Sequence, residues 1–88
     1  MSDAPPWRVT VESPASRTIR GLSRPDSRRI LEAIRALPTV GDVKRLQGRP
    51  GYWRLRVGGW RVIFRRDDQA RAIIVERVAT RGDIYKRR

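Results

Sequence analysis

Residues 52–65 decide the fold that this sequence predicts, and they read Tyr-Trp-Arg-Leu-Arg-Val-Gly-Gly-Trp-Arg-Val-Ile-Phe-Arg. Apolar and basic side chains alternate on both sides of Gly58-Gly59, which is the period of a strand with one buried face. A two-residue glycine turn is typical of a β-hairpin, because such a turn needs positive φ. We therefore expect antiparallel strands at 52–57 and 60–65.

The hairpin register predicts which side chains share a face. With Gly58-Gly59 as the turn, the facing pairs are Val57 with Trp60, Arg56 with Arg61, Leu55 with Val62, and Arg54 with Ile63. Because side chains alternate between faces, one face is apolar and the other carries the arginines, with Tyr52 and Arg65 nearby. Three guanidinium groups on one patch favour an anion site, although like charges directly opposite each other are destabilising. The alternative is a solvated face on which long arginines splay apart.

Two helices are expected before this hairpin. Ser13 is predicted to be an N-cap, with Pro14 at the first helical position of a short helix over 14–22. A second helix over 25–37 places apolar residues on one stripe, and Pro38 ends it. That stripe consists of Ile30, Leu31, Ile34 and Leu37.

The remaining segments complete an α+β pattern. Residues 7–12 alternate like a half-buried strand, residues 38–51 are rich in Gly and Pro and are expected to form a loop, and residues 72–79 are apolar and β-branched like a central strand. The expected order is β-α-α-β-β-β, with an antiparallel sheet covered on one face by the helical hairpin. We expect one domain over 1–88, in which 1–6 is a flexible tail.

The composition excludes several kinds of chemistry. The 88 residues contain no histidine and no cysteine, so the commonest general base, disulfides and thiolate metal ligands are ruled out. No run of about 18 apolar residues occurs, and the polar start has no signal-peptide pattern. A soluble, cytoplasmic protein without a membrane partner is expected.

The charge is distributed unevenly along the chain. The net charge is +12, and residues 44–88 carry fourteen basic and four acidic side chains, against seven and five in residues 1–43. Nineteen of the cations are arginine, whose guanidinium binds phosphate bidentately and stacks on bases. Codon bias in a GC-rich genome explains much of the preference for arginine over lysine, but not its concentration in one half. A polyanionic partner is therefore expected.

Two stretches resemble RelE-like toxins of the RelE/ParE superfamily. The segment 46–64 contains a Leu-x-Gly, a basic-apolar-basic strand, a Gly turn, an aromatic-Arg pair and an aromatic close. The segment 77–85 is similar to the family's closing Val-Gly-His-Arg-x-x-x-Tyr, with Thr80 in place of the histidine. With the preceding strand and helix pair, the resemblance covers residues 7–85.

This resemblance implies a toxin of a type II toxin–antitoxin module. RelE-like toxins enter the ribosomal A site and cut the mRNA with the message's own 2′-OH, without a metal or another cofactor. The implied partners are a RelB-like antitoxin, the ribosome and mRNA. The catalytic positions that it implies are Arg54, Arg56, Arg61, Arg81 and Tyr85. Further RNA contacts are expected from Tyr52, Lys44, Arg45 and Arg65.

Two alternatives remain open at the level of sequence. ParE toxins share the architecture but poison DNA gyrase and are not nucleases. A basic nucleic-acid-binding domain without catalysis would carry the same charged face. Arg54 also stands where relatives can carry lysine, and arginine cannot readily lose a proton. The resemblance therefore assigns no general base.

Overall fold

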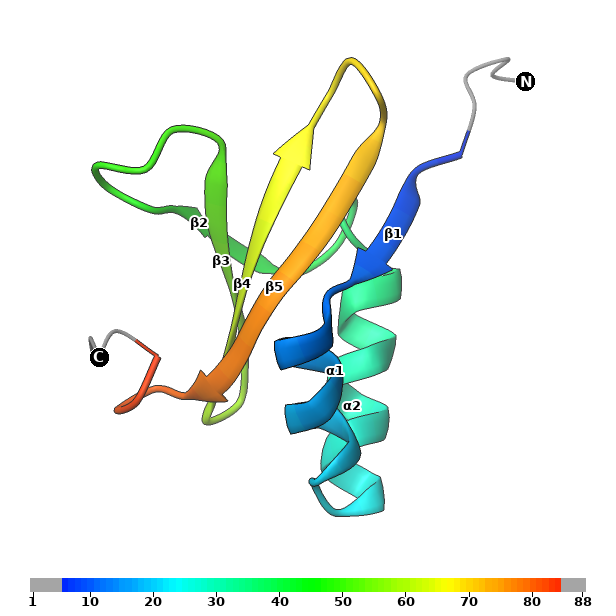
Figure 1. Cartoon of the computed structure of the whole chain (residues 1–88), viewed down its shortest axis with the longest axis vertical. Helices are drawn as coiled ribbons and strands as arrows, with labels where there is room; N and C mark the ends of the chain where they lie inside the picture. Colours follow the sequence, from blue (N-terminus) through cyan, green and yellow to red (C-terminus); the bar gives the residue numbers. More distant parts are fainter. Residues whose placement is uncertain (1–5, 85–88) are drawn as a thin grey trace.

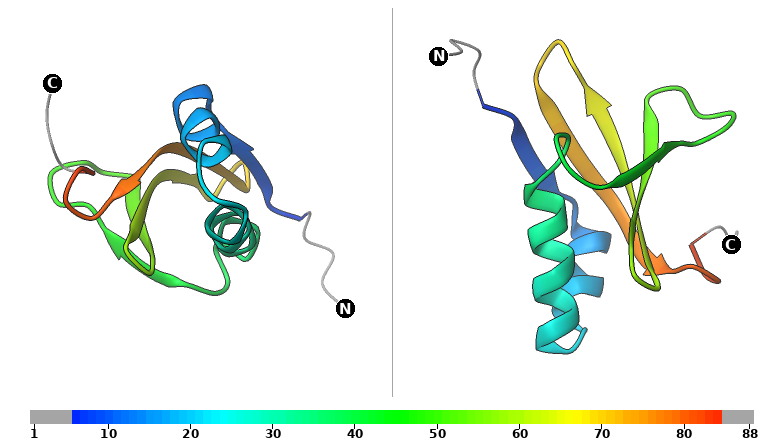
Figure 2. Two further views of the ribbon diagram at one scale, coloured as in Figure 1. Left: turned by 90° about the horizontal axis from the view of Figure 1, so that it is seen from below. Right: turned by 180° about the vertical axis from the view of Figure 1, so that it is seen from behind.

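The computed structural model describes residues 6–84, which form two helices and one five-stranded sheet (Figure 1). The elements are β1 (Arg8–Val11), α1 (Ser13–Arg20), α2 (Arg24–Arg35), β2 (Asp42–Arg45), β3 (Tyr52–Val57), β4 (Trp60–Asp67) and β5 (Ala72–Thr80). The strand order across the sheet is β1-β5-β4-β3-β2. Both helices lie on the same side of the twisted sheet, and the views in Figure 2 agree on this arrangement. The α+β class is confirmed.

The helix boundaries lie close to the predicted ones. Helix α1 already begins at Ser13, so the predicted N-cap is wrong, and Glu12 takes that place without a side-chain hydrogen bond. Helix α2 is capped by Ser23, whose hydroxyl accepts a hydrogen bond from the Asp26 N–H at 3.4 Å. Within residues 6–84, neither helix is long and apolar enough to cross a membrane.

The core lies between the helix pair and the apolar face of the hairpin. Ile30 and Ile34 of the predicted stripe are buried and Leu31 is half-buried. On the sheet, Phe64 and Val62 are almost fully buried. The buried cluster consists of Ala15, Ile19, Ile30, Ile34, Leu37, Leu55, Val62, Phe64, Ile73, Val75 and Val78. The prediction of which hairpin face packs against the helices is confirmed.

The hairpin has the predicted register in all four pairs. Val57 faces Trp60, Arg56 faces Arg61, Leu55 faces Val62, and Arg54 faces Ile63. Of the two turn glycines, Gly58 takes a positive φ of 58°, and Gly59 does not adopt that left-handed region. One glycine with positive φ is therefore enough to reverse the chain here.

The sheet differs from the expected one in two respects. Strand β2 falls inside the predicted loop and pairs antiparallel with β3. It was missed because it has one apolar residue, Val43, in four, and a short polar strand at a sheet edge has no alternating pattern to reveal it. Strand β1 pairs parallel with β5, so the sheet is mixed and not purely antiparallel. Apart from Pro6, the predicted tail lies outside the described residues.

Candidate anion-binding site

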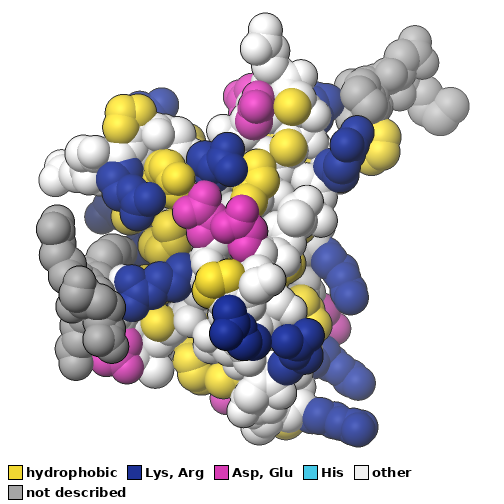
Figure 3. Space-filling model, in the orientation of Figure 1, with side chains coloured by type: hydrophobic (Ala, Val, Ile, Leu, Met, Phe, Trp, Pro, Cys, Tyr) yellow, Lys and Arg dark blue, Asp and Glu magenta, His cyan; other side chains and the backbone are white. Residues whose placement is uncertain are grey.

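The face of the sheet opposite the helices, called the open face below, collects most of the predicted site residues. Register places Lys44, Tyr52, Arg54, Arg56, Arg61, Arg65 and Arg77 there. Figure 3 shows Lys and Arg side chains distributed over both the sheet side and the helix side of the visible surface, with a group of acidic side chains among them near the centre. The position of the three hairpin arginines on one face is thus as predicted.

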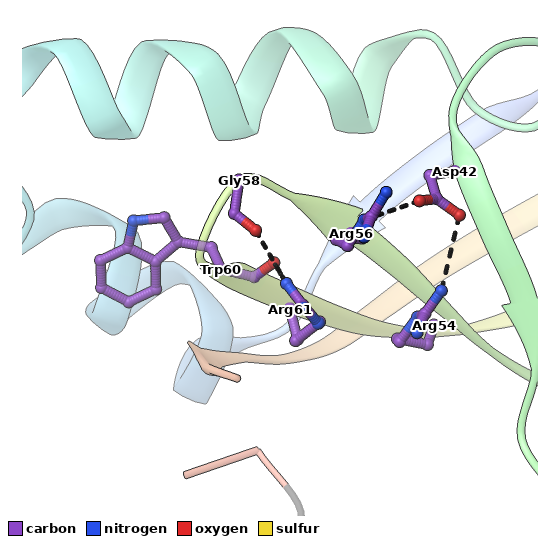
Figure 4. A network of polar contacts seen from close by, with 6 residues as sticks. All are labelled: Asp42, Arg54, Arg56, Gly58, Trp60 and Arg61. Carbon is purple, nitrogen blue, oxygen red and sulfur yellow. Dashed lines mark hydrogen bonds and ion pairs between the residues drawn. The ribbon is translucent and has the colours of Figure 1, made fainter. Parts of the chain in front are cut away.

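Asp42 bridges two of these arginines (Figure 4). Its carboxylate lies 2.7 Å from Arg56 Nε and 3.5 Å from Arg54 Nη2. The register puts Asp42 directly opposite Arg56 on the edge strand. The carboxylate therefore offsets the repulsion between two cations that alternation places on the same face.

Arg61 is held by backbone instead of by a carboxylate. Its Nη1 donates to the carbonyl oxygens of Gly58 and Trp60, at 2.9 Å each. Figure 4 shows the side chain folded over the hairpin turn, while Arg54 and Arg56 point toward Asp42. The three guanidinium groups share a face, but they do not converge on one point.

Arg54 is the most enclosed of the three. Its side chain is 19% exposed, against 55% for Arg56. Within residues 6–84, its Nε is buried and has no hydrogen-bond partner. A buried charged donor without a partner carries a desolvation cost of about 1–3 kcal/mol or more. Because Nε itself is closed to solvent, an oxyanion would have to bind Arg54 through the exposed part of its side chain.

Arg54 also lines a broad groove, called the open-face groove below, of ≈ 1520 Å³. Its polar lining includes Lys44, Arg77 and Glu76, and it is bordered by α1. Its complete lining is Pro14, Thr18, Lys44, Arg45, Leu46, Gln47, Arg49, Arg54, Ile63, Glu76, Arg77, Val78, Ala79 and Ile84. Arg56 and Arg61 stand outside this lining.

A second polar network on the open face joins side chains from β3, β4 and β5. Glu76 Oε2 accepts hydrogen bonds from the Tyr52 hydroxyl and from Arg65 Nε, both at 3.2 Å. The hydrogen bond to Glu76 raises the pKa of Arg65 above its ordinary value. The Arg49 guanidinium lies 3.9 Å from the centre of the Tyr52 ring. Tyr52 is therefore held rigidly by a carboxylate on one side and a cation on the other.

The segment after β5 turns back toward the hairpin. The Arg81 N–H donates to the Gly59 carbonyl at 3.0 Å, which places Arg81 beside the turn that carries Arg61. Arg77 Nη2 donates to the Asp83 carbonyl at 3.0 Å and ties this segment to the strand. Tyr85, the last predicted catalytic residue, lies outside the described residues.

The expected RNA-contacting residues are divided between the two faces. Tyr52, Lys44 and Arg65 belong to the open face. Arg45 pairs with Trp53 and its guanidinium lies 5.4 Å from the centre of that indole, on the helix-facing side, although it also borders the open-face groove. The structure thus does not bring Arg45 into one cluster with Arg54.

Sequence reasoning missed Asp42, Glu76 and Arg77. A signal for Glu76 and Arg77 was available, because they are the two charged residues in segment 72–79, whose other residues are apolar. A register shift near Ile63 and Phe64 lets the consecutive residues Glu76 and Arg77 lie on the same face, which strict alternation does not predict. Asp42 had no such signal, because it lies in the segment 38–51, whose Gly and Pro residues predict a loop. Among residues 6–84, no three acidic side chains gather as metal ligands would.

Comparison with known proteins adds the family. The model of the ParE toxin of type II toxin–antitoxin systems (parDE) matches residues 12–85. A search among curated protein sequences found no significant match.

Solved structures resemble this fold closely. RelE in the archaeal RelE–RelB complex from Pyrococcus horikoshii OT3 is 24% identical, with a TM-score of 0.71 over 88% of this chain and 97% of that one. A chain of the RelB–RelE complex from Methanococcus jannaschii is 23% identical, with a TM-score of 0.72 over 86% of this chain and 94% of that one. The isolated E. coli RelE toxin is 16% identical, with a TM-score of 0.68 over 90% of each chain.

The fold and the family match together define a toxin of the type II toxin–antitoxin class. The chain belongs to the ParE toxin family, within the RelE/ParE superfamily. The structural neighbours are RelE toxins, and at these identities they establish a common fold.

Proposed function

We propose that this toxin is a ribosome-dependent, metal-independent endoribonuclease that cuts mRNA in the A site by attack of the message's 2′-OH. The observation that carries the proposal is the position of Arg54, Arg56 and Arg61 on one face of the sheet, the open face, with the enclosed Arg54 lining the open-face groove. Such donors suit a phosphate group, which guanidinium binds through paired hydrogen bonds.

The proposed catalysis is mainly electrostatic. Attack of the 2′-oxygen on the adjacent phosphorus forms a phosphorane with extra negative charge, and expulsion of the 5′-oxygen leaves a 2′,3′-cyclic phosphate. Fixed guanidinium groups stabilise that charge more than the ground-state charge, which lowers the barrier. In the free protein Asp42 and the turn carbonyls hold these cations, so the substrate phosphate has to compete for them. Arg81 and Tyr85 are proposed to assist at the leaving group and the 2′-OH.

Glu76 is the proposed proton acceptor. Arginine does not accept a proton from the 2′-OH, and the sequence contains no histidine. Glu76 is the carboxylate that lines the open-face groove together with Arg54. Its hydrogen bonds from Tyr52 and Arg65 fix its position on the sheet.

A reconstituted translation reaction tests the nuclease proposal. The purified toxin is added to ribosomes stalled with a defined codon in the A site, and primer extension on the message locates any cut. Wild-type toxin is expected to give a cut in the A-site codon, and Arg81→Ala to give much less. Intact message at full ribosome occupancy would contradict the proposal.

The family match supports a second candidate, a poison of DNA gyrase without nuclease activity. The two candidates differ in product, because a gyrase poison leaves message intact and produces gyrase-linked DNA breaks. Incubating the toxin with purified gyrase and supercoiled plasmid, alongside the ribosome reaction, separates them. Breaks in the first reaction and an intact message in the second favour the gyrase candidate.

An antitoxin partner and a cytoplasmic location belong to the same proposal. The solved relatives from P. horikoshii and M. jannaschii are RelE–RelB complexes. A RelB-like protein with acidic segments would be complementary to a chain of net charge +12. Co-expression of the neighbouring short reading frame is expected to restore growth, and its protein product is expected to co-purify with the toxin.

A further inference from the structure

Arginine and tryptophan side chains alternate across the helix-facing side of the sheet, at the margin of the core. Arg45 lies over Trp53 at 5.4 Å, and Arg66 lies between Trp53 and Trp7 at 6.0 and 5.2 Å from the ring centres. Arg71 lies over Trp7 at 5.3 Å. We call these five residues the Arg–Trp ladder. Each rung is a cation–π contact, so the planar groups are pre-positioned.

The ladder lies where the helices do not cover the sheet. In Figures 1 and 2 the tip of the β4–β5 hairpin and the β2–β3 loop extend past the end of the helix pair. Trp53 and Arg66 belong to that end of β3 and β4, and the Arg8 N–H donates to the Arg71 carbonyl at 2.8 Å, which fixes Trp7 nearby. The ladder thus lies at an end of the sheet that no helix covers, where Trp7 and Trp53 are half-buried against the margin of the core.

A groove of ≈ 1070 Å³, called the loop groove below, begins at this ladder. Trp53 and Arg66 form one side of it, and the loop between β2 and β3 forms the other. Gly48 and Gly51 of that loop have no heavy atom within 4 Å of the position of a Cβ, so a ligand can approach their backbone closely. The complete lining is Arg45, Leu46, Gln47, Gly48, Arg49, Pro50, Gly51, Trp53, Arg66 and Asp68.

The loop groove and the open-face groove share part of their lining. Both are lined by Arg45, Leu46, Gln47 and Arg49. Tyr52 and Trp53 are consecutive in β3, so their rings lie on opposite faces of the sheet. Arg49 lies over the Tyr52 ring and Arg45 lies over the Trp53 ring. A flexible chain could pass from one face to the other around this edge without leaving a surface of arginines and aromatic rings.

We infer that the Arg–Trp ladder and the loop groove are a second binding segment for single-stranded RNA, which holds the substrate strand as it leaves the open-face groove. Alternating guanidinium and indole planes suit unstacked bases and their phosphates. The lining has three arginines, Arg45, Arg49 and Arg66, and one carboxylate, Asp68, which forms an ion pair with Arg66 at 2.6 Å. The remaining net positive charge favours a polyanion. The inference rests on the proposed function in that it takes RNA to be the substrate.

An acidic protein segment is the competing occupant, and the geometry favours RNA. An amphipathic helix needs an apolar stripe to pack against, whereas three of the ten residues in this lining are apolar, namely Leu46, Pro50 and Trp53. Flat cationic and aromatic groups at the edge of a loop match bases better than aliphatic side chains. The protein alternative remains a separate outcome of the experiment below.

The test measures binding of the full chain to a short, labelled 2′-O-methyl oligouridine, which lacks the nucleophile and cannot be cut. Arg45→Gln/Arg66→Gln is compared with Arg28→Gln/Arg35→Gln, which removes the same charge from an exposed groove on α2. The ladder variant is expected to weaken binding about tenfold or more, and to reduce the salt slope by about 1.4, the value for two phosphate contacts. The α2 variant should bind nearly as wild type.

A second variant separates stacking from charge. Trp7→Leu keeps every cation, and it is expected to weaken binding of the single strand several-fold while leaving binding of a duplex of equal length unchanged. Circular dichroism melting establishes that each variant is folded. Equal losses for the ladder and α2 variants, or no change in single-strand binding with Trp7→Leu, would overturn the inference. Binding of polyglutamate, an acidic polypeptide, is measured in parallel as the probe of the protein alternative. The inference would also fail if the ladder variant lost affinity for polyglutamate and kept its affinity for the oligouridine. Because the probe cannot be cut, these outcomes are independent of whether the message is cleaved.

Discussion

Arg56 and Arg61 face each other across the β3–β4 ladder, yet their guanidinium groups are held by different acceptors. Arg56 turns outward to Asp42 on the edge strand, and Arg61 folds over the turn onto the Gly58 and Trp60 carbonyls (Figure 4). Two cations at this spacing repel each other. Separate acceptors let the sheet keep both on one face until an anion arrives.

Removing the Asp42 carboxylate should strengthen RNA binding. In Asp42→Asn, Arg54 and Arg56 lose their anionic partner, so a phosphate no longer competes with a carboxylate for them. We expect tighter oligonucleotide binding at low salt and a stability loss of about 1 kcal/mol, because Asp42 and Arg56 are exposed and Arg54 is the enclosed partner. Glu32→Gln, on the exposed side of α2, is the matched control. Weaker binding by Asp42→Asn would contradict this role.

Arg61→Ala should separate activity from stability. If Arg61 stabilises the phosphorane, its removal is expected to slow A-site cleavage about a hundredfold or more. Its bonds are to turn carbonyls at the surface, so the free energy of unfolding should change by less than about 0.5 kcal/mol. Arg28→Ala on α2 removes the same side chain at an exposed site and should cut normally. Equal rates for the two variants would remove Arg61 from the mechanism.

Glu76→Gln tests the proton acceptor. The amide keeps the shape of the side chain and can still accept hydrogen bonds from Tyr52 and Arg65, but it cannot take a proton at neutral pH. Single-turnover cleavage is expected to fall by about 10²–10⁴-fold. Tyr52→Phe is the companion variant, because it loses one bond to Glu76 and keeps the carboxylate. Cleavage by Glu76→Gln at the wild-type rate would assign the base elsewhere.

The two turn glycines should respond differently to alanine. Gly58 has a φ of 58°, and a Cβ there would lie 3.0 Å from Arg29 Nη2. Gly58→Ala is expected to cost about 1–2 kcal/mol, the usual penalty of a side chain in the left-handed region. Gly59→Ala meets no atom within 4 Å and should be nearly neutral. Urea unfolding of both variants measures the difference, and equal costs would count against the turn geometry.

Phe64→Ala should unfold most of the protein. Phe64 is 1% exposed, and it is the largest of the almost fully buried side chains. Its loss is expected to cost about 3–5 kcal/mol, a large share of the stability of so small a domain. Thermal melting by circular dichroism measures this loss, and Phe64→Leu should retain most of the stability. A small effect of the alanine variant would mean that the core lies elsewhere.

The hairpin was predictable because its information is local. Alternation of Arg54, Leu55 and Arg56 and the turn at Gly58-Gly59 fix both register and face, since a slip of one residue would bury cations and expose apolar side chains. The stripe of Ile30 and Ile34 predicted the buried side of α2 in the same way. Edge strand β2 escaped prediction because it has no apolar pattern of its own.

The sequence by itself determined the α+β class and the position of the arginines on the face opposite the helices. In β3 and β4 successive side chains point to opposite faces of the sheet, so the alternation of apolar and basic residues fixes which face carries the arginines. Only the tertiary structure decided what each cation meets. Asp42 comes from a strand without a sequence signal, and a register shift lets Glu76 and Arg77 both lie on the open face. The Arg–Trp ladder joins residues from four separate segments, and contacts between distant segments depend on how the strands are ordered in space, which no local pattern encodes.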